Sequence, residues 1–144
     1  MALSAVIAPF DGAEYDYYTT AKGILEKVRA HAGDVDFEVQ PELLSLFSNR
    51  DFGRYAGEKG EMNVCFISNN DITGGNSGSA MFNARGELLG LAFDGNWEAM
   101  SSDILYEPKM QRCIGVDVRY ILFMIEKYGK AGDLIRELKI VSGK

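Results

Sequence analysis

The chain is poor in histidine and cysteine. Its 144 residues include one histidine and two cysteines. His31, Cys65 and Cys113 are not spaced as metal ligands, so we predict neither a metal site nor a cofactor. Both cysteines lie in apolar runs that resemble strands, and we therefore expect two buried free thiols rather than a disulfide.

Long apolar runs and basic clusters are also missing. No run approaches the roughly 18 apolar residues of a membrane span, so we expect no membrane insertion. Residues 1–8 lack the basic and apolar regions of a secretory signal peptide, and we expect none in this stretch. The 15 Lys and Arg residues are scattered and outnumbered by 21 Asp and Glu residues, which makes nucleic acid a poor candidate partner.

The remaining composition is that of a globular protein. Hydrophobic residues make up 47% of the sequence, and 144 residues are enough to bury a substantial core. We predict a mainly β chain with flanking helices. It divides into a mixed helical and extended lead-in (1–60), a β-rich portion (61–118) and closing helices (119–144).

Local patterns predict the individual elements. Alternation and β-branched residues favour strands, apolar residues at helical spacing favour helices, and Thr19-Thr20 can cap the first helix. The predicted strands cover residues 36–39, 62–68, 87–93 and 112–118, and the predicted helices begin at residues 21, 41, 118 and 131. A short strand and a turn at residues 83–86 connect the glycine-rich loop at residues 71–80 to the strand at 87–93.

The loop at residues 71–80 carries the candidate nucleophile. Gly75-Asn76-Ser77-Gly78 resembles the Gly-x-Ser-Gly sequence of trypsin-like serine proteases. This resemblance implies that Ser77 is the nucleophile and that the N–H groups of Gly75 and Ser77 form the oxyanion hole. A phosphate-binding loop would need a lysine, and an α/β-hydrolase elbow would need glycine where Ser79 stands. A glycine-rich hairpin connection without catalytic function remains an alternative.

A base for Ser77 is missing from the sequence. A serine hydroxyl needs a base within hydrogen-bonding reach, commonly a histidine oriented by a carboxylate. His31 lies at the end of a predicted helix, where a solvated helix-end residue is the favoured interpretation, and no lysine has a spacing that singles it out. We therefore favour the hypothesis that the chain is part of a larger enzyme.

Three longer segments resemble one enzyme family. Residues 69–79, 86–98 and 116–122 are similar to the C-terminal region of the bacterial dipeptidyl-peptidases of types 7 and 11. These are periplasmic or surface-associated serine exopeptidases, with a trypsin-like double β-barrel and an added helical domain. The resemblance implies that the chain is the C-terminal barrel portion of such an enzyme, in which residues 61–118 carry the nucleophile.

The resemblance also implies roles for individual residues. Asp94 would bind the α-amino group of a peptide substrate with a free N-terminus. Gly95 would leave the specificity pocket open and uncharged for a large apolar side chain, as in type 7, whereas type 11 has an arginine there that attracts Asp or Glu. Without the family context, the aspartate of an Asp-Gly turn is the favoured interpretation of Asp94.

The family's catalytic histidine and aspartate lie in its N-terminal half, which no segment of this sequence matches. We therefore expect that half as a partner, and we expect the isolated chain to be inactive. The alternative hypothesis is a non-catalytic, protease-like interaction module, whose exposed barrel edges could drive homodimerisation.

Overall fold

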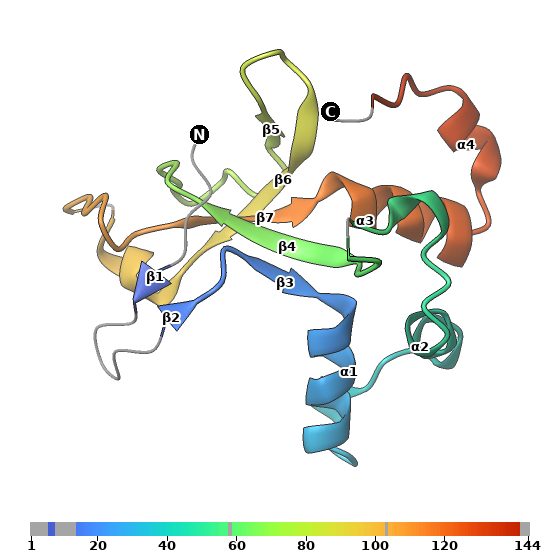
Figure 1. Ribbon diagram of the computed structural model, residues 1–144. Helices are drawn as coiled ribbons and strands as arrows, with labels where there is room; N and C mark the ends of the chain where they lie inside the picture. Colours follow the sequence, from blue (N-terminus) through green and yellow to red (C-terminus); the bar gives the residue numbers. More distant parts are fainter. Residues whose placement is uncertain (1–5, 8–13, 58, 103, 142–144) are drawn as a thin grey trace. The chain divides into compact units, whose positions relative to one another are not determined.

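The computed structural model describes residues 6–7, 14–57, 59–102 and 104–141, drawn in colour in Figure 1. The chain folds into two compact units. The first comprises Met1–Thr19 and Cys65–Val118, and the second comprises Thr20–Val64 and Arg119–Lys144. The units thus interleave along the chain, whereas the sequence analysis divides it into three consecutive parts. The units interleave because strands from distant parts of the chain pair in one sheet, and helices from distant parts of the chain pack around one core.

The first unit is built around a five-stranded sheet, whose strands run from blue (β3) to orange (β7) in Figure 1. Its order is β3 (Tyr18–Thr20), β4 (Asn63–Ser68), β7 (Cys113–Asp117), β6 (Leu88–Gly95) and β5 (Ala80–Phe82). β7 pairs antiparallel with β4 and β6, and β6 pairs antiparallel with β5. β1 (Val6–Ile7) and β2 (Glu14–Tyr15) form a separate antiparallel pair. The predicted mainly β chain with flanking helices is confirmed, and the trypsin-like double β-barrel stays a prediction.

Two glycines allow close packing in the core of this sheet. Its buried residues are Phe66, Met81, Ala92 and Cys113. A Cβ atom on Gly90 would lie 2.0 Å from the carbonyl oxygen of Val116, and one on Gly115 would lie 2.9 Å from the Phe66 ring. Neither position can hold a side chain without moving the backbone or the ring.

Both cysteines belong to the first unit, and both are free thiols. Cys113 is buried, whereas Cys65 is only partly buried. Burial raises the pKa of each thiol above its ordinary value. The expectation of a buried thiol therefore holds for Cys113 and only in part for Cys65.

The second unit contains the helices. They are α1 (Ala21–Ala30), α2 (Pro41–Ser48), α3 (Val118–Phe123) with its π-helical continuation η4 (Met124–Tyr128), and α4 (Gly132–Arg136). As expected, the Thr20 hydroxyl caps α1 by accepting the N–H of Gly23 at 3.3 Å. The buried core consists of Ala21, Phe47, Phe52, Tyr55, Met62 and Phe123. No helix in the described ranges is both long enough and apolar enough to cross a membrane.

One predicted strand is wrong. Residues 36–39 were predicted as a strand because polar and apolar side chains alternate there, but Val35–Phe37 forms the 3₁₀ helix η1. Asp34 Oδ1 accepts the N–H of Asp36 at 3.1 Å and so closes the first turn. Phe37 then stacks on His31, with ring centroids 4.0 Å apart. The apolar start of the sequence predicts a strand or extended arm followed by a turn within residues 3–18, and part of that stretch lies outside the described residues.

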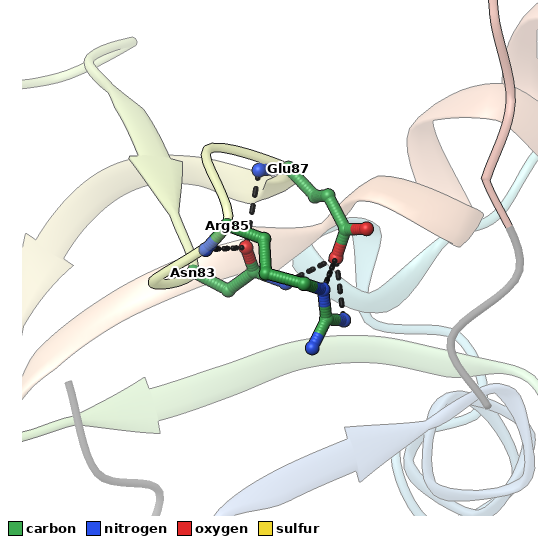
Figure 2. A network of polar contacts seen from close by, with 3 residues as sticks. All are labelled: Asn83, Arg85 and Glu87. Atoms are coloured by element: carbon green, nitrogen blue, oxygen red, sulfur yellow. Dashed lines mark hydrogen bonds and ion pairs between the residues drawn. The ribbon is translucent and has the colours of Figure 1, made fainter.

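The predicted turn at residues 83–86 connects β5 to β6 and is held by the polar network in Figure 2. Asn83 Oδ1 accepts the N–H groups of Arg85 at 2.8 Å and of Glu87 at 3.1 Å. The Glu87 carboxylate accepts hydrogen bonds from the Asn83 amide and from the Arg85 guanidinium, the latter at 2.6 Å. Gly86 has a φ of 75°, a conformation that glycine adopts readily.

This network predicts a measurable shift in the titration of Glu87. The Arg85 guanidinium and the Asn83 amide hold the pKa of Glu87 below its ordinary value of 4.5. Because the pKa is depressed in the folded state, the stabilisation is present above pH 4.5 and is lost as the pH falls through the lower, folded pKa. We expect Arg85→Gln to raise the pKa of Glu87 in a carboxyl NMR titration and Arg29→Gln to leave it unchanged. Equal values in all three proteins would contradict the network.

Candidate active site

The loop between β4 and β5 adopts its shape through backbone hydrogen bonds and glycine conformations. The N–H of Thr73 donates to Asn76 Oδ1 at 3.1 Å, and the N–H of Asn76 donates to the Thr73 carbonyl at 3.3 Å. This reciprocal pair closes a turn around Gly74 and Gly75. Gly75 has a φ of 92° and Gly78 a φ of 88°, which side chains disfavour.

The loop lies along the end of β6. The N–H of Gly78 donates to the Ala92 carbonyl at 2.7 Å, and the N–H of Ala92 donates to the Ser79 carbonyl at 2.9 Å. One residue further along each segment, the exposed Ser77 hydroxyl donates to the Phe93 carbonyl at 3.1 Å. Ser77 is therefore fixed beside the last three residues of the strand.

β6 carries an irregularity at this point. Its pairing with β7 shifts register between Ala92, which lies opposite Gly115, and Asp94, which lies opposite Ile114. One extra residue, Phe93, is accommodated, and both Phe93 and Asp94 are exposed. The bulge thus places Asp94 and Gly95 next to the serine loop.

A hollow of about 270 Å³ brings together three of the four predicted site residues, Ser77, Asp94 and Gly95. Its other lining residues are Ile72, Thr73, Gly74, Phe93, Asn96, Ala99, Met100 and Ser102. Asp94 Oδ1 accepts the N–H of Gly95 at 2.8 Å, which fixes the side chain at the rim of the bulge. The roles predicted for these residues stay predictions.

The fourth predicted residue, Gly75, does not line the hollow. Within the part of the chain that the structure describes, the N–H groups of Gly75 and Ser77 have no hydrogen-bond acceptor. Exposed N–H groups without an acceptor are what an oxyanion hole requires. The geometry is therefore compatible with the predicted role.

Sequence reasoning missed the opposite wall of the hollow. Ala99 and Met100 belong to the 3₁₀ helix η3 (Trp97–Ser101), within residues 95–103, for which the sequence predicts a loop. Asn96 starts this segment: its N–H donates to the Arg112 carbonyl at 3.0 Å, and its Oδ1 accepts the Arg112 N–H at 2.8 Å. The available signal in the sequence was Asn96-Trp97 within a polar stretch, and this pair of residues does not specify a 3₁₀ helix bonded to Arg112.

Two buried polar side chains hold the rest of the segment. Gln111 is 2% exposed and donates to the Leu105 carbonyl at 3.1 Å while its oxygen accepts the N–H of Glu107 at 2.8 Å. Arg112 is 6% exposed, and its guanidinium donates to the carbonyls of Pro108, Lys109 and Gln111. The excursion between β6 and β7 is therefore internally anchored.

His31 belongs to the second unit, at the C-terminal end of α1, where its N–H donates to the Lys27 carbonyl. Its ring is occupied by stacking on Phe37. Across the described ranges, no group of three or more His, Cys, Asp or Glu residues could hold a metal ion.

The positive φ of Gly75 predicts a backbone-specific cost of substitution. A Cβ on Gly75 or on Gly74 would meet nothing within 4 Å, but only Gly75 has a φ that disfavours side chains. We expect Gly75→Ala to lower the free energy of unfolding by roughly 1–2 kcal/mol. Gly74→Ala should change it by less than about 0.5 kcal/mol. Urea unfolding of both variants measures the difference, and equal effects would show that the loop backbone is not constrained.

Comparisons with known proteins identify the family. The family model of peptidase S46 matches residues 6–140. Dipeptidyl-peptidase 7 of Porphyromonas endodontalis is 58% identical over 136 residues, covering 94% of this chain and 16% of that protein. Dipeptidyl-peptidase 7 of Porphyromonas gingivalis is 56% identical over 133 residues, covering 92% of this chain and 18% of that protein.

More distant relatives and solved structures agree. An Asp/Glu-specific dipeptidyl-peptidase of Capnocytophaga gingivalis is 46% identical over 137 residues, covering 95% of this chain and 19% of that protein. The crystal structure of Porphyromonas endodontalis DPP11 in complex with the dipeptide Arg-Glu matches with a TM-score of 0.88 and 41% identity, over 94% of this chain and 19% of that chain. The chain spans less than a fifth of the length of these relatives, and it belongs to the peptidase S46 family.

Proposed function

We propose that the chain is the nucleophile-bearing C-terminal part of a longer serine dipeptidyl-peptidase, which releases dipeptides from free peptide N-termini. The observation that carries the proposal is the hollow that Ser77, Asp94 and Gly95 line together. The resemblance of the sequence to this family predicted all three residues. In the parent enzyme, we expect the sheet to complete one barrel of a trypsin-like double β-barrel, located in the periplasm or at the cell surface.

The proposed reaction uses Ser77 as the nucleophile. Its oxygen attacks the carbonyl carbon of the second peptide bond while the hydroxyl proton passes to a histidine from the missing N-terminal half. The developing oxyanion accepts hydrogen bonds from the N–H groups of Gly75 and Ser77. The protonated histidine then donates to the leaving amine, and water hydrolyses the acyl-enzyme. Without the missing histidine and aspartate, the isolated chain is expected to be inactive.

Substrate selection follows from the walls of the hollow. Asp94 is the one ionisable side chain among the described lining residues, and its carboxylate suits the cationic N-terminus of a peptide. Ile72, Ala99 and Met100 supply apolar surface, which favours an apolar side chain before the scissile bond. The relatives at 56–58% identity carry the name dipeptidyl-peptidase 7, and the relative named Asp/Glu-specific is less similar at 46%.

A non-catalytic interaction module is the second candidate function. It is favoured by the exposed apolar side chains of the segment after β6, where Trp97 is 69%, Leu105 71% and Ile104 92% exposed. Such a surface could drive homodimerisation. Activity of the parent protein distinguishes the two candidates.

Ser77→Ala tests the proposed reaction. In the longest natural reading frame that contains this chain, we expect the variant to lose the release of a fluorogenic dipeptide by about 10³-fold or more, because the nucleophile is gone. Ser79→Ala, two residues away in the same loop, serves as the matched control and should retain activity. An inactive parent protein would favour the interaction module, and an active Ser77→Ala protein would exclude Ser77 as the nucleophile.

Asp94→Asn tests recognition of the free N-terminus. The amide keeps the size of the side chain but loses its charge, so we expect KM to rise at least 10-fold for a dipeptide substrate with a free α-amino group. A substrate whose amino group is acetylated should show no such difference between the parent and the variant. An unchanged KM for the free-amine substrate would assign Asp94 to turn formation alone.

A further inference from the structure

We propose that Ala99 sets the depth of the specificity pocket together with Gly95, and so decides how large a side chain the pocket accepts before the scissile bond. The inference rests on the proposed function, because it concerns the pocket beside Ser77. It adds a residue that lies outside the segments whose sequence predicted the site.

The two residues are in direct steric contact. A Cβ atom on Gly95 would lie 2.9 Å from the Ala99 Cβ, closer than such atoms approach one another in proteins. The next nearest atoms, Ile72 Cγ2 and the Arg112 carbonyl oxygen, would be 3.7 Å and 3.8 Å away. Among the described residues, Ala99 is thus the group that fills the space in front of Gly95.

Ala99 is not free to move back. Its N–H donates to the Asn96 carbonyl at 2.9 Å, and its carbonyl accepts the N–H of Ser102 at 3.0 Å. Asn96 is bound to both backbone groups of Arg112, and its amide also donates to the Met110 carbonyl at 2.9 Å. Because the buried Gln111 and Arg112 side chains anchor the rest of the segment, η3 acts as a fixed wall.

The fixed wall couples the sizes of residues 95 and 99. A larger side chain at position 99 would project into a hollow of only about 270 Å³ and exclude bulky substrates. Glycine at position 99 would deepen the hollow and also make room for a Cβ at position 95. Each methylene group that a pocket gains or loses changes selectivity by roughly 10- to 200-fold.

Selectivity in the full-length protein tests the proposal. The substrates are fluorogenic dipeptides that end in alanine or in phenylalanine. We expect Ala99→Leu to lower kcat/KM for the phenylalanine substrate by about 10- to 100-fold, mainly through KM, and to change the alanine substrate less than about 3-fold. Ala84→Leu, the same change at an exposed turn residue outside the hollow, should change neither substrate.

A second pair of variants tests the contact without depending on activity. We expect Gly95→Ala to lower the melting temperature and the double variant Gly95→Ala with Ala99→Gly to recover it, because the added Cβ then has space. Failure of Ala99→Gly to recover the stability of Gly95→Ala would overturn the steric coupling. Equal losses on both substrates for Ala99→Leu would overturn the role in selectivity.

The proposed function fails in a distinguishable way. If the parent protein releases no dipeptides, or if Ser77→Ala remains active, the proposed function is wrong, and the role of Ala99 in selectivity is overturned with it. If the parent is active and Ser77→Ala is not, only the comparison of the two substrates decides the role of Ala99.

Discussion

The first unit depends on the close approach of β4, β6 and β7 around the ring of Phe66. Gly90 on β6 and Gly115 on β7 have no side chains, so the ring lies directly against both strands, and a Cβ at either position would collide with backbone or ring atoms. Tight packing of this kind leaves little freedom to shift strand register. The packing at these two glycines therefore fixes the register of β6, and with it the positions of the bulge at Phe93 and of the serine loop bonded to it.

The candidate site is held mainly by the backbone. The Ser77 hydroxyl donates to a carbonyl of β6, and the Asp94 carboxylate accepts the N–H of the following residue. The opposite wall is held by the hydrogen bonds between Asn96 and Arg112. Buried polar side chains that donate to carbonyls can order a long connection without an apolar core of its own. This explains how a segment with strongly exposed apolar residues, such as Ile104, keeps a defined shape.

The sequence predicted what local patterns determine. The turn at residues 83–86, the cap at Thr20 and the glycine loop around Ser77 follow from residue types at short spacing, and the structure contains all three. The strand expected at residues 36–39 does not form, because the hydrogen bond that Asp34 Oδ1 accepts from the N–H of Asp36 favours a 3₁₀ turn over the alternating pattern. The wall at Ala99 depends on partners such as Arg112, more than ten positions along the chain, and no local pattern encodes such a contact. The prediction that Ser77, Asp94 and Gly95 belong to one site rested on the family resemblance and not on the spacing of these residues in the sequence.

The interleaving of the two units has a consequence for the order in which the chain folds during synthesis. All segments of the first unit have been made once Val118 has been added, whereas the second unit needs residues up to the closing helices. Met62 and Phe47, made early, pack in the same core as Phe123. Met62 and Phe47 cannot be fully buried until Phe123 has been made. The sheet is therefore the unit that can fold first on the ribosome, and the helical core folds after it.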